Sequence, residues 1–143
     1  MIYLDTSALL KRYVPEANSD IFDNYFVGSA PFLISQLVLV ELRCTLARKR
    51  RNKEIAAGRE KAAMGEVRTD IQDGLLVISS VADTHFSEAL HLMDALPKFP
   101  LRSLDAIHLA IANSHQTHEI ATADNIFRQA AQALQIKVAY FGT

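Results

Sequence analysis

The chain has few of the features that stabilise secreted or membrane proteins. It contains one cysteine, Cys44, which excludes a disulfide framework and a zinc site built from several thiolates. No stretch approaches the ~18 consecutive apolar residues that a membrane span needs. The beginning, MIYLDTSALL, has no basic leader before an apolar run, so we expect no signal peptide. These absences predict a cytoplasmic protein that does not enter a membrane.

The chain also lacks an excess of positive charge. Its formal net charge is −1, so no overall basic field indicates a nucleic-acid-binding protein. With five glycines, it has no glycine-rich phosphate loop. Half of its 143 residues are hydrophobic and 22% are charged, which is ordinary globular composition. We expect one domain, in which any contact with nucleic acid comes from a local cluster.

Short apolar runs alternate with longer helical patterns. This alternation is typical of an α/β fold with a central parallel sheet of four to five strands flanked by helices. Strands are predicted at 2–5, 32–35, 75–79, 119–123 and 137–141. Helices are predicted around 6–13, 18–27, 36–51, 53–72, 83–96, 103–116 and 125–134. Ser35, Asp83 and Ser103 are the expected N-caps of three of them.

The stretch 48–74 is polar and helical in pattern, although Gly58 and Gly65 each weaken a helix by ~1 kcal/mol. We interpret it as part of a helix pair that projects from the sheet. No linker divides the chain.

Two acids follow predicted strands. Asp5 ends the first strand, and Asp124 follows the fourth. In an open parallel sheet, sites form beyond the carboxyl ends of the strands, where the strand order reverses. If these two strands are neighbours there, both side chains should point into one crevice.

Two further acids lie in apolar surroundings. Glu41 lies within LVLVEL and shares a helical face with Leu37, Val38 and Cys44, so we expect it to be partly buried. Asp105 lies in the apolar helix LRSLDAIHLAIA, close to its positive N-terminal end. A buried carboxylate without a partner is costly and calls for a cation, a hydrogen-bond network or protonation.

Four acids in one crevice would repel one another unless a divalent cation lay among them. Oxygen ligands without cysteine favour Mg²⁺ or Mn²⁺ over zinc. Such an ion binds phosphate oxygens and activates water, which indicates hydrolysis of a phosphodiester.

Each acid also has a purely structural interpretation. Asp5 and Asp124 could cap the helices that follow them, and Asp105 could complement a helix dipole. Glu41 could face solvent if the apolar run turned outward. Only convergence of all four would favour the metal site, and the sequence does not establish it.

Four segments together resemble the acidic motifs of PIN-domain nucleases, and more narrowly of VapC toxins from toxin–antitoxin pairs. These segments are IYLDTSALLKRY, LVLVELRCTLAR, LRSLDAIHLAIA and IATADNIFRQAAQAL, in the family's order and at its usual separations. The resemblance covers essentially the whole chain and implies a single PIN-like domain over 1–143. It departs from the family at none of the four acids.

The resemblance implies roles for individual residues. Asp5 and Asp105 match the principal metal ligands, and Glu41 and Asp124 match the acids that complete the site directly or through water. Thr122 matches a small hydroxyl residue that could orient water. Thr6 and Ser7, which follow the first acid, could form hydrogen bonds around the site.

The resemblance also implies a mechanism and partners. A water bound to Mg²⁺, or to Mn²⁺ in its place, would attack an RNA phosphate and leave a 5′-phosphate and a 3′-hydroxyl. The substrate would be structured RNA such as tRNA or ribosomal RNA. A VapB-type antitoxin would block the groove, and the protein would form a homodimer.

Basic residues near the acids are candidates for binding RNA phosphates. They are Lys11, Arg12, Arg48, Lys49, Arg50 and Arg51. The alternatives are simple exposure for the first two and a solvated helix end for the other four. His108, one turn after Asp105, is expected to be a packed histidine rather than a metal ligand.

Three rival functions are open to this sequence. A haloacid-dehalogenase-type phosphatase needs an acid two residues after its nucleophile, where this chain has Ser7. A response-regulator receiver needs a lysine at the end of its fifth strand, and Lys137 lies within that strand. The other alternative is a PIN-like module that binds RNA or a partner without catalysis; the presence of all four acids disfavours it.

Overall fold

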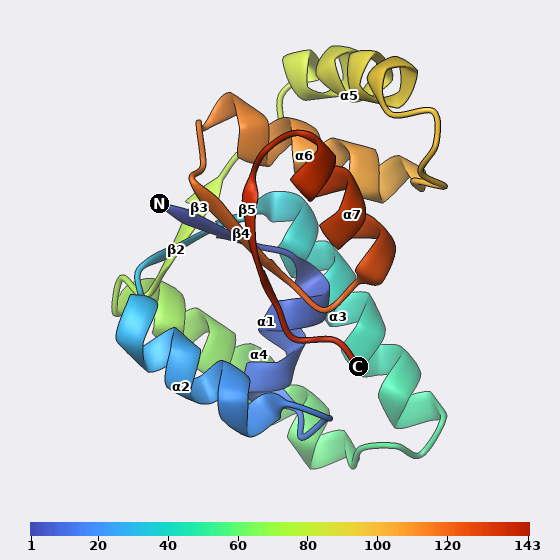
Figure 1. Ribbon diagram of the computed structural model, residues 1–143. Helices are drawn as coiled ribbons and strands as arrows, with labels where there is room; N and C mark the ends of the chain where they lie inside the picture. Colours follow the sequence, from blue (N-terminus) through green and yellow to red (C-terminus); the bar gives the residue numbers. More distant parts are fainter.

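A five-stranded parallel sheet forms the centre of the molecule (Figure 1). The computed structural model describes all residues, 1–143. The strands are β1 (Ile2–Leu4), β2 (Phe32–Ser35), β3 (Leu76–Ser79), β4 (Glu119–Thr122) and β5 (Lys137–Tyr140). Their spatial order is β3-β2-β1-β4-β5, and every neighbouring pair is parallel. The predicted α/β class and the five predicted strand positions are therefore confirmed.

Seven helices connect the strands and cover the sheet. They are α1 (Thr6–Tyr13), α2 (Ser19–Ser29), α3 (Gln36–Arg51), α4 (Ala57–Gln72), α5 (Asp83–Ala95), α6 (Ser103–Ser114) and α7 (Asn125–Ala133). Figure 1 shows α5, α6 and α7 on one side of the sheet, and α1, α2 and α4 on the other. Helix α3 packs against α1 and α4. Each helix begins and ends within two residues of its predicted bounds, except that α4 begins four residues later than predicted.

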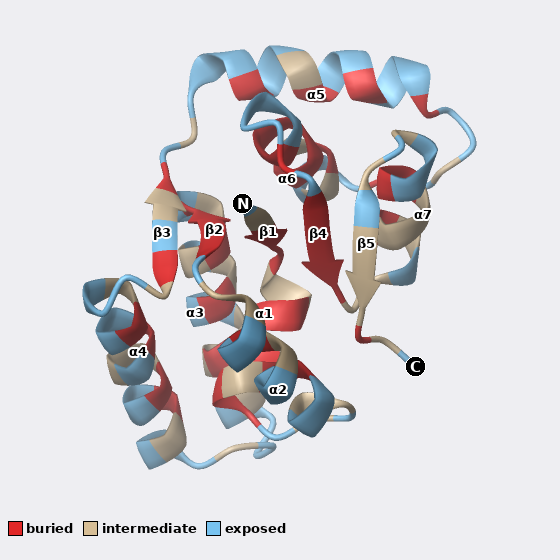
Figure 2. Ribbon diagram, turned by 60° about the vertical axis from the view of Figure 1, so that its left-hand side comes forward, coloured by how far each residue is buried: buried red, intermediate tan, exposed pale blue.

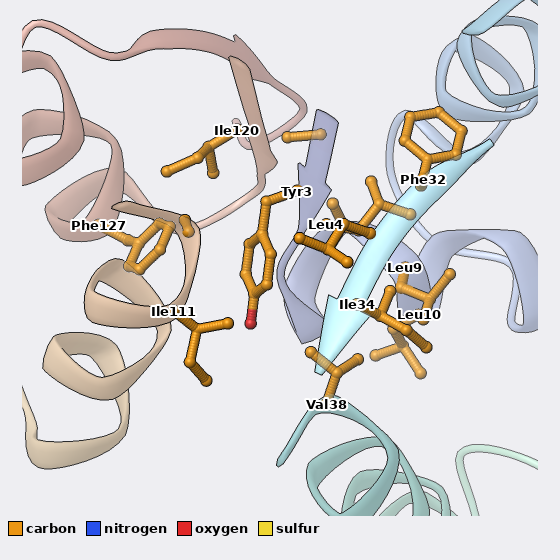
Figure 3. Packing of buried hydrophobic residues seen from close by; sticks show 14 of the residues in the cluster. Tyr3, Leu4, Leu9, Leu10, Phe32, Ile34, Val38, Ile111, Ile120 and Phe127 are labelled. Carbon is orange, nitrogen blue, oxygen red and sulfur yellow. The ribbon is translucent and has the colours of Figure 1, made fainter. Parts of the chain in front are cut away.

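The central strands are buried on both faces because helices cover each side. Tyr3 and Leu4 of β1, and Ile120 and Ala121 of β4, are fully buried, as the red strands in Figure 2 show. Buried parallel strands read as continuous apolar runs rather than as alternating patterns, which explains why such short segments were recognisable. Figure 3 shows Tyr3 and Leu4 packed among side chains from both helical layers.

Helix caps are only partly as predicted. Ser35 caps α3, since its hydroxyl accepts a hydrogen bond from the Val38 amide over 3.3 Å. The caps of α5 and α6 lie one residue earlier than predicted, at Ala82 and Arg102, neither of which caps the helix with its side chain. At the N-terminus of each of these two helices, the side chain of the third helical residue accepts a hydrogen bond from the backbone amide of the cap residue. His85 of α5 accepts through Nδ1 over 2.9 Å, and Asp105 of α6 accepts through Oδ2 over 3.2 Å.

The segment 48–74 contains the end of α3 and the whole of α4, so the predicted helical pattern is present. Helix α4 buries one side chain on each successive turn: Glu60, Ala63, Val67 and Asp70. It packs against α1, α3 and β3. A weak apolar stripe of an alanine and a valine among polar residues thus lies on the packed face of α4, and projection of the helix pair from the sheet stays a prediction.

No helix is long and apolar enough to cross a membrane.

Candidate active site

The strand order reverses between β1 and β4. The chain passes from β1 to β2 and β3 on one side, and β4 then returns to pair with β1, with Leu4 opposite Ala121. Asp5 directly follows β1, and Asp124 lies two residues after β4. The condition that the sequence argument required, adjacency of these two strands, is therefore met, and their carboxyl ends lie at one edge of the sheet.

A pocket of about 250 Å³ lies at this edge. The lining residues are Asp5, Thr6, Ser7, Leu10, Glu41, Thr45, Arg48, Asp105, His108 and Asp124. The fold thus brings all four predicted acids to one pocket, although they come from the ends of two strands and from two helices. One hydrophobic side chain, Leu10, lies among them.

Asp5 is the most buried of the four acids, with 5% of its surface exposed. Oδ1 accepts from the Ser7 hydroxyl (2.7 Å) and the Ala8 amide (3.0 Å), and Oδ2 accepts from the Thr122 hydroxyl (2.6 Å). Burial raises the pKa of Asp5 above its ordinary value, and these hydrogen bonds offset only part of that rise. Asp5 therefore caps α1 and lines the pocket, so the two interpretations are not alternatives.

Asp124 and Thr122 connect the end of β4 to the pocket. Asp124 caps α7 through Oδ1, which accepts from the Phe127 amide over 2.9 Å. The Thr122 hydroxyl accepts from the Asp124 amide over 3.0 Å and donates to Asp5. Thr122 is fully buried and does not line the pocket. Its hydroxyl holds Asp5 in place, and the predicted role in orienting water stays a prediction.

Asp105 lies in the first turn of α6 and accepts from the Arg102 amide through Oδ2. Burial, followed by the charges of Asp124 and Glu41, raises its pKa above the ordinary value. The negative groups of the pocket therefore influence one another.

Glu41 is half-buried on α3, with its side chain 24% exposed. Its Oε1 accepts from the Thr6 hydroxyl (2.9 Å) and lies in hydrogen-bond contact with His108 Nε2. Burial alone would raise the pKa of Glu41, but the hydrogen bond and charge of His108, together with Thr6, leave it below its ordinary value. The predicted partial burial is confirmed, although Cys44, three residues further along α3, is exposed.

The donor atoms of the pocket suit a hard divalent ion. Asp105 Oδ1, Asp124 Oδ2 and Glu41 Oε2 have no hydrogen-bond partner in the protein. No three His, Cys, Asp or Glu side chains lie close enough together to hold an ion in their present positions. The residues therefore supply suitable ligands, while the side chains must turn toward one another to share an ion.

The structure argues against RNA-binding roles for Lys11 and Arg12. Lys11 is 7% exposed, and its Nζ donates to the Ala17 carbonyl over 2.6 Å. Arg12 forms a bidentate pair with Asp70 (2.7 and 3.0 Å) and lies 4.0 Å from the centre of the Phe26 ring. Both side chains are engaged inside the fold, and neither lines the pocket.

The basic run at the end of α3 spreads around the helix. Lys49 Nζ lies 3.5 Å from Glu16, and Arg50 pairs with Glu60. Arg51 is exposed and lies away from the pocket. Arg48 alone of the run lines the acidic pocket, and no carboxylate pairs with it.

Sequence reasoning missed Tyr3. Its hydroxyl, fully buried, lies 2.7 Å from His108 Nδ1 and 3.1 Å from Ser35 Oγ. His108 is packed, as predicted, and is 3% exposed, but it also reaches Glu41. The available signal was a phenol in a strand otherwise too apolar to satisfy it.

Comparison with known proteins agrees with this architecture. The model of the PIN domain family matches residues 2–133. The chain belongs to the PIN-domain family. A curated relative, ribonuclease VapC46 of Mycobacterium tuberculosis, is 32% identical over 139 residues, which cover 96% of this chain and 95% of that protein. Membership of this family excludes the phosphatase and receiver interpretations.

Solved structures show the same fold at lower identity. The VapC20 toxin of M. tuberculosis aligns with this PIN domain at a TM-score of 0.71 and 17% identity, covering 91% of this chain and 95% of the other. FitAcB of Neisseria gonorrhoeae aligns at 0.71 and 20%, covering 99% and 97%. VapBC2 of Rickettsia felis, solved with a DNA fragment from its promoter, aligns at 0.65 and 15%, covering 99% of both chains.

Proposed function

We propose that this PIN domain is the toxin of a type II toxin–antitoxin pair and acts as a Mg²⁺-dependent endoribonuclease. The observation that carries the proposal is that four carboxylates line one pocket, at the edge of the sheet where the strand order reverses between β1 and β4. The relationship to ribonuclease VapC46 supports RNA as the substrate.

Asp5, Asp105, Glu41 and Asp124 would hold the ion, with Mn²⁺ able to substitute. A bound divalent cation relieves the electrostatic repulsion among four neighbouring carboxylates, and oxygen atoms are the ligands that Mg²⁺ prefers. When bound, the ion supplies a Lewis acid for the phosphate and lowers the pKa of a water molecule. The chain's own residues arrange the ligands: Thr122 and Ser7 hold Asp5, and the Arg102 amide holds Asp105.

Cleavage of an RNA panel tests this function. Purified protein is incubated with tRNA and ribosomal RNA in Mg²⁺, Mn²⁺ or EDTA, beside Asp5→Asn and the control Glu66→Gln, an acid on α4 paired with Arg59 away from the pocket. We expect the wild type and the control to produce discrete fragments with 5′-phosphates when Mg²⁺ or Mn²⁺ is present, and none in EDTA. Asp5→Asn should produce no such fragments under any of these conditions. Equal cleavage by Asp5→Asn and the wild type would refute the proposal.

Structured RNA, either tRNA or ribosomal RNA, is the proposed substrate. The structurally similar VapC20 is described as a toxin that cleaves the sarcin–ricin loop. We propose that Arg48 contacts an RNA phosphate, because it is the one arginine that lines the acidic pocket.

Binding measured in EDTA tests Arg48 without cleavage. Arg48→Ala should weaken RNA binding and reduce the slope of log affinity against log salt by about 0.7–0.9. Arg51→Ala, an exposed position on the same helix, is the control and should change neither. Equal effects of the two substitutions would contradict a specific role for Arg48.

An antitoxin is the proposed protein partner. Similar folds include a toxin–antitoxin complex from Klebsiella pneumoniae, FitAB bound to DNA, and VapBC2 bound to DNA. We propose that a VapB-type antitoxin covers the acidic pocket and that the PIN domain forms a homodimer in the cytoplasm. Exposed apolar side chains on α5, Phe86, Leu90 and Met93, support association with another chain.

A non-catalytic binding module is the second candidate. It is favoured by one observation, the absence of three ligands close enough to hold an ion in the present side-chain positions. Titration with Mn²⁺ separates the two, because a protein that binds no divalent ion cannot carry out the proposed hydrolysis.

A further inference from the structure

A chain of buried polar groups leads from the centre of the sheet to the acidic pocket. It begins at Ser35 at the end of β2, passes through Tyr3 of β1 and His108 of α6, and ends at Glu41 of α3. Tyr3 and Ser35 are fully buried, and His108 is 3% exposed. Figure 3 shows the Tyr3 hydroxyl directed between the helix that carries Ile111 and the start of the helix that carries Val38.

The histidine is fixed on both of its nitrogens. Nδ1 lies 2.7 Å from the Tyr3 hydroxyl, and Nε2 contacts Glu41 Oε1. An ionised carboxylate can only accept, so the proton between His108 and Glu41 belongs to Nε2. The ring also packs edge-on against Phe127 and at 57° to the Tyr3 ring. The imidazole is thus held in one orientation by groups from three other elements.

The contact with His108 leaves the two carboxylate oxygens of Glu41 in different environments. Oε1 receives both protein hydrogen bonds, from His108 and from the Thr6 hydroxyl over 2.9 Å. Oε2 receives none and belongs to a side chain that lines the pocket. Two donors on one oxygen fix the carboxylate while leaving the other oxygen available to a ligand.

We infer that His108, backed by Tyr3, is a positioning residue that presents Glu41 Oε2 to the divalent ion. The inference rests on the proposed function, because it needs an ion in the pocket. When a group that hydrogen-bonds to a metal ligand and orients it is removed, the metal affinity typically falls by about 10- to 100-fold. His108 itself does not need to touch the ion or the RNA.

The experiment is a calorimetric titration of the RNA-free, full-length protein with Mn²⁺. The variants are His108→Phe, which keeps a ring without nitrogens, His108→Gln, which keeps an amide donor, and Tyr3→Phe, which removes only the hydroxyl. We expect Mn²⁺ affinity to fall by about 10-fold or more in His108→Phe. His108→Gln should recover part of the loss, and Tyr3→Phe should cause a smaller one.

A double-mutant cycle separates positioning from general damage to the fold. In a Glu41→Gln background, His108→Phe should have no further effect on Mn²⁺ affinity, because the carboxylate through which His108 acts on the ion is already absent. Equal losses in both backgrounds, or no loss in the wild-type background, would overturn the inference. If His108→Phe does not fold, Tyr3→Phe in both backgrounds gives the same decision.

Failure of the proposed function has a different signature. If the wild type binds no Mn²⁺, or Asp5→Asn binds it as tightly as the wild type, the metal site itself is wrong. If Asp5→Asn and Glu41→Gln both weaken binding while His108→Phe does not, the site stands and only the role of His108 is refuted.

Discussion

At the scale of the residue, neutral donors rather than cations hold most of the acids. Asp5 accepts from two hydroxyls and one amide, and Asp105 and Asp124 each accept from one amide. Such donors fix a carboxylate without cancelling its charge, which then remains available to an ion. The sequence identified two of the acids from their apolar surroundings and two from their places after predicted strands. Most of these donors are local helix caps, but the donation from Thr122 to Asp5 depends on tertiary packing.

Asp70 illustrates an acid with a structural role. It accepts two hydrogen bonds from Arg12 and one from the Tyr13 hydroxyl over 2.6 Å. Burial alone would raise the pKa of Asp70, but Arg12 and Tyr13 outweigh it and hold this pKa below its ordinary value. Sequence analysis passed over Asp70 because it lies in the polar stretch of α4.

We predict that Asp70→Asn lowers the free energy of unfolding by about 2 kcal/mol at neutral pH. Because the pKa of Asp70 is lower in the folded state, its contribution is present above the ordinary value of 3.8 and is lost as pH falls through the folded-state value. Urea denaturation at several pH values measures this. The gap between wild type and variant should narrow below about pH 4.

The control for this measurement is Glu66→Gln on the same helix, whose side chain is 49% exposed and pairs with Arg59. Its effect should stay below about 0.5 kcal/mol. A gap between Asp70→Asn and the wild type that widens in acid would contradict the assigned direction of the pKa shift.

At the scale of the element, sequence patterns located the helices and strands better than their ends. The central β-strands, only three or four residues long, were recognised because both of their faces are buried. The caps of α5 and α6 were misplaced because Ser and Asp also occur as first helical residues. The basic run of α3 was read as one cluster, but helical geometry turns Arg48 toward the pocket and Arg50 toward Glu60.

Ser35 provides a test of the element that carries Glu41. Its hydroxyl caps α3 and contacts the Tyr3 hydroxyl, and it is fully buried. We expect Ser35→Ala to lower the free energy of unfolding by about 1–2 kcal/mol. Ser103→Ala is the matched control, because Ser103 is exposed, caps no helix and should change stability by less than about 0.5 kcal/mol. Chemical denaturation that ranks the two the other way would disprove the cap assignment.

At the scale of the whole molecule, the strand order determines the pocket. Placing β4 beside β1 brings together acids that lie more than a hundred residues apart, such as Asp5 and Asp124. The sequence could predict parallel strands and acids at their ends, but it left open which strands are neighbours. The sequence could not predict the Tyr3–His108–Glu41 contacts, because they require the packing of β1, α3 and α6 together.

The central claim is that the four-carboxylate pocket performs metal-dependent cleavage, and the single-turnover cleavage rate of one RNA substrate tests it most directly. The rate is measured against Mg²⁺ concentration for the wild type, Asp105→Asn and the control Glu66→Gln. We predict that the wild type and the control reach the same plateau, while Asp105→Asn is slower by more than about a hundredfold. A rate independent of Mg²⁺, or an Asp105→Asn rate equal to that of the wild type, would contradict the account.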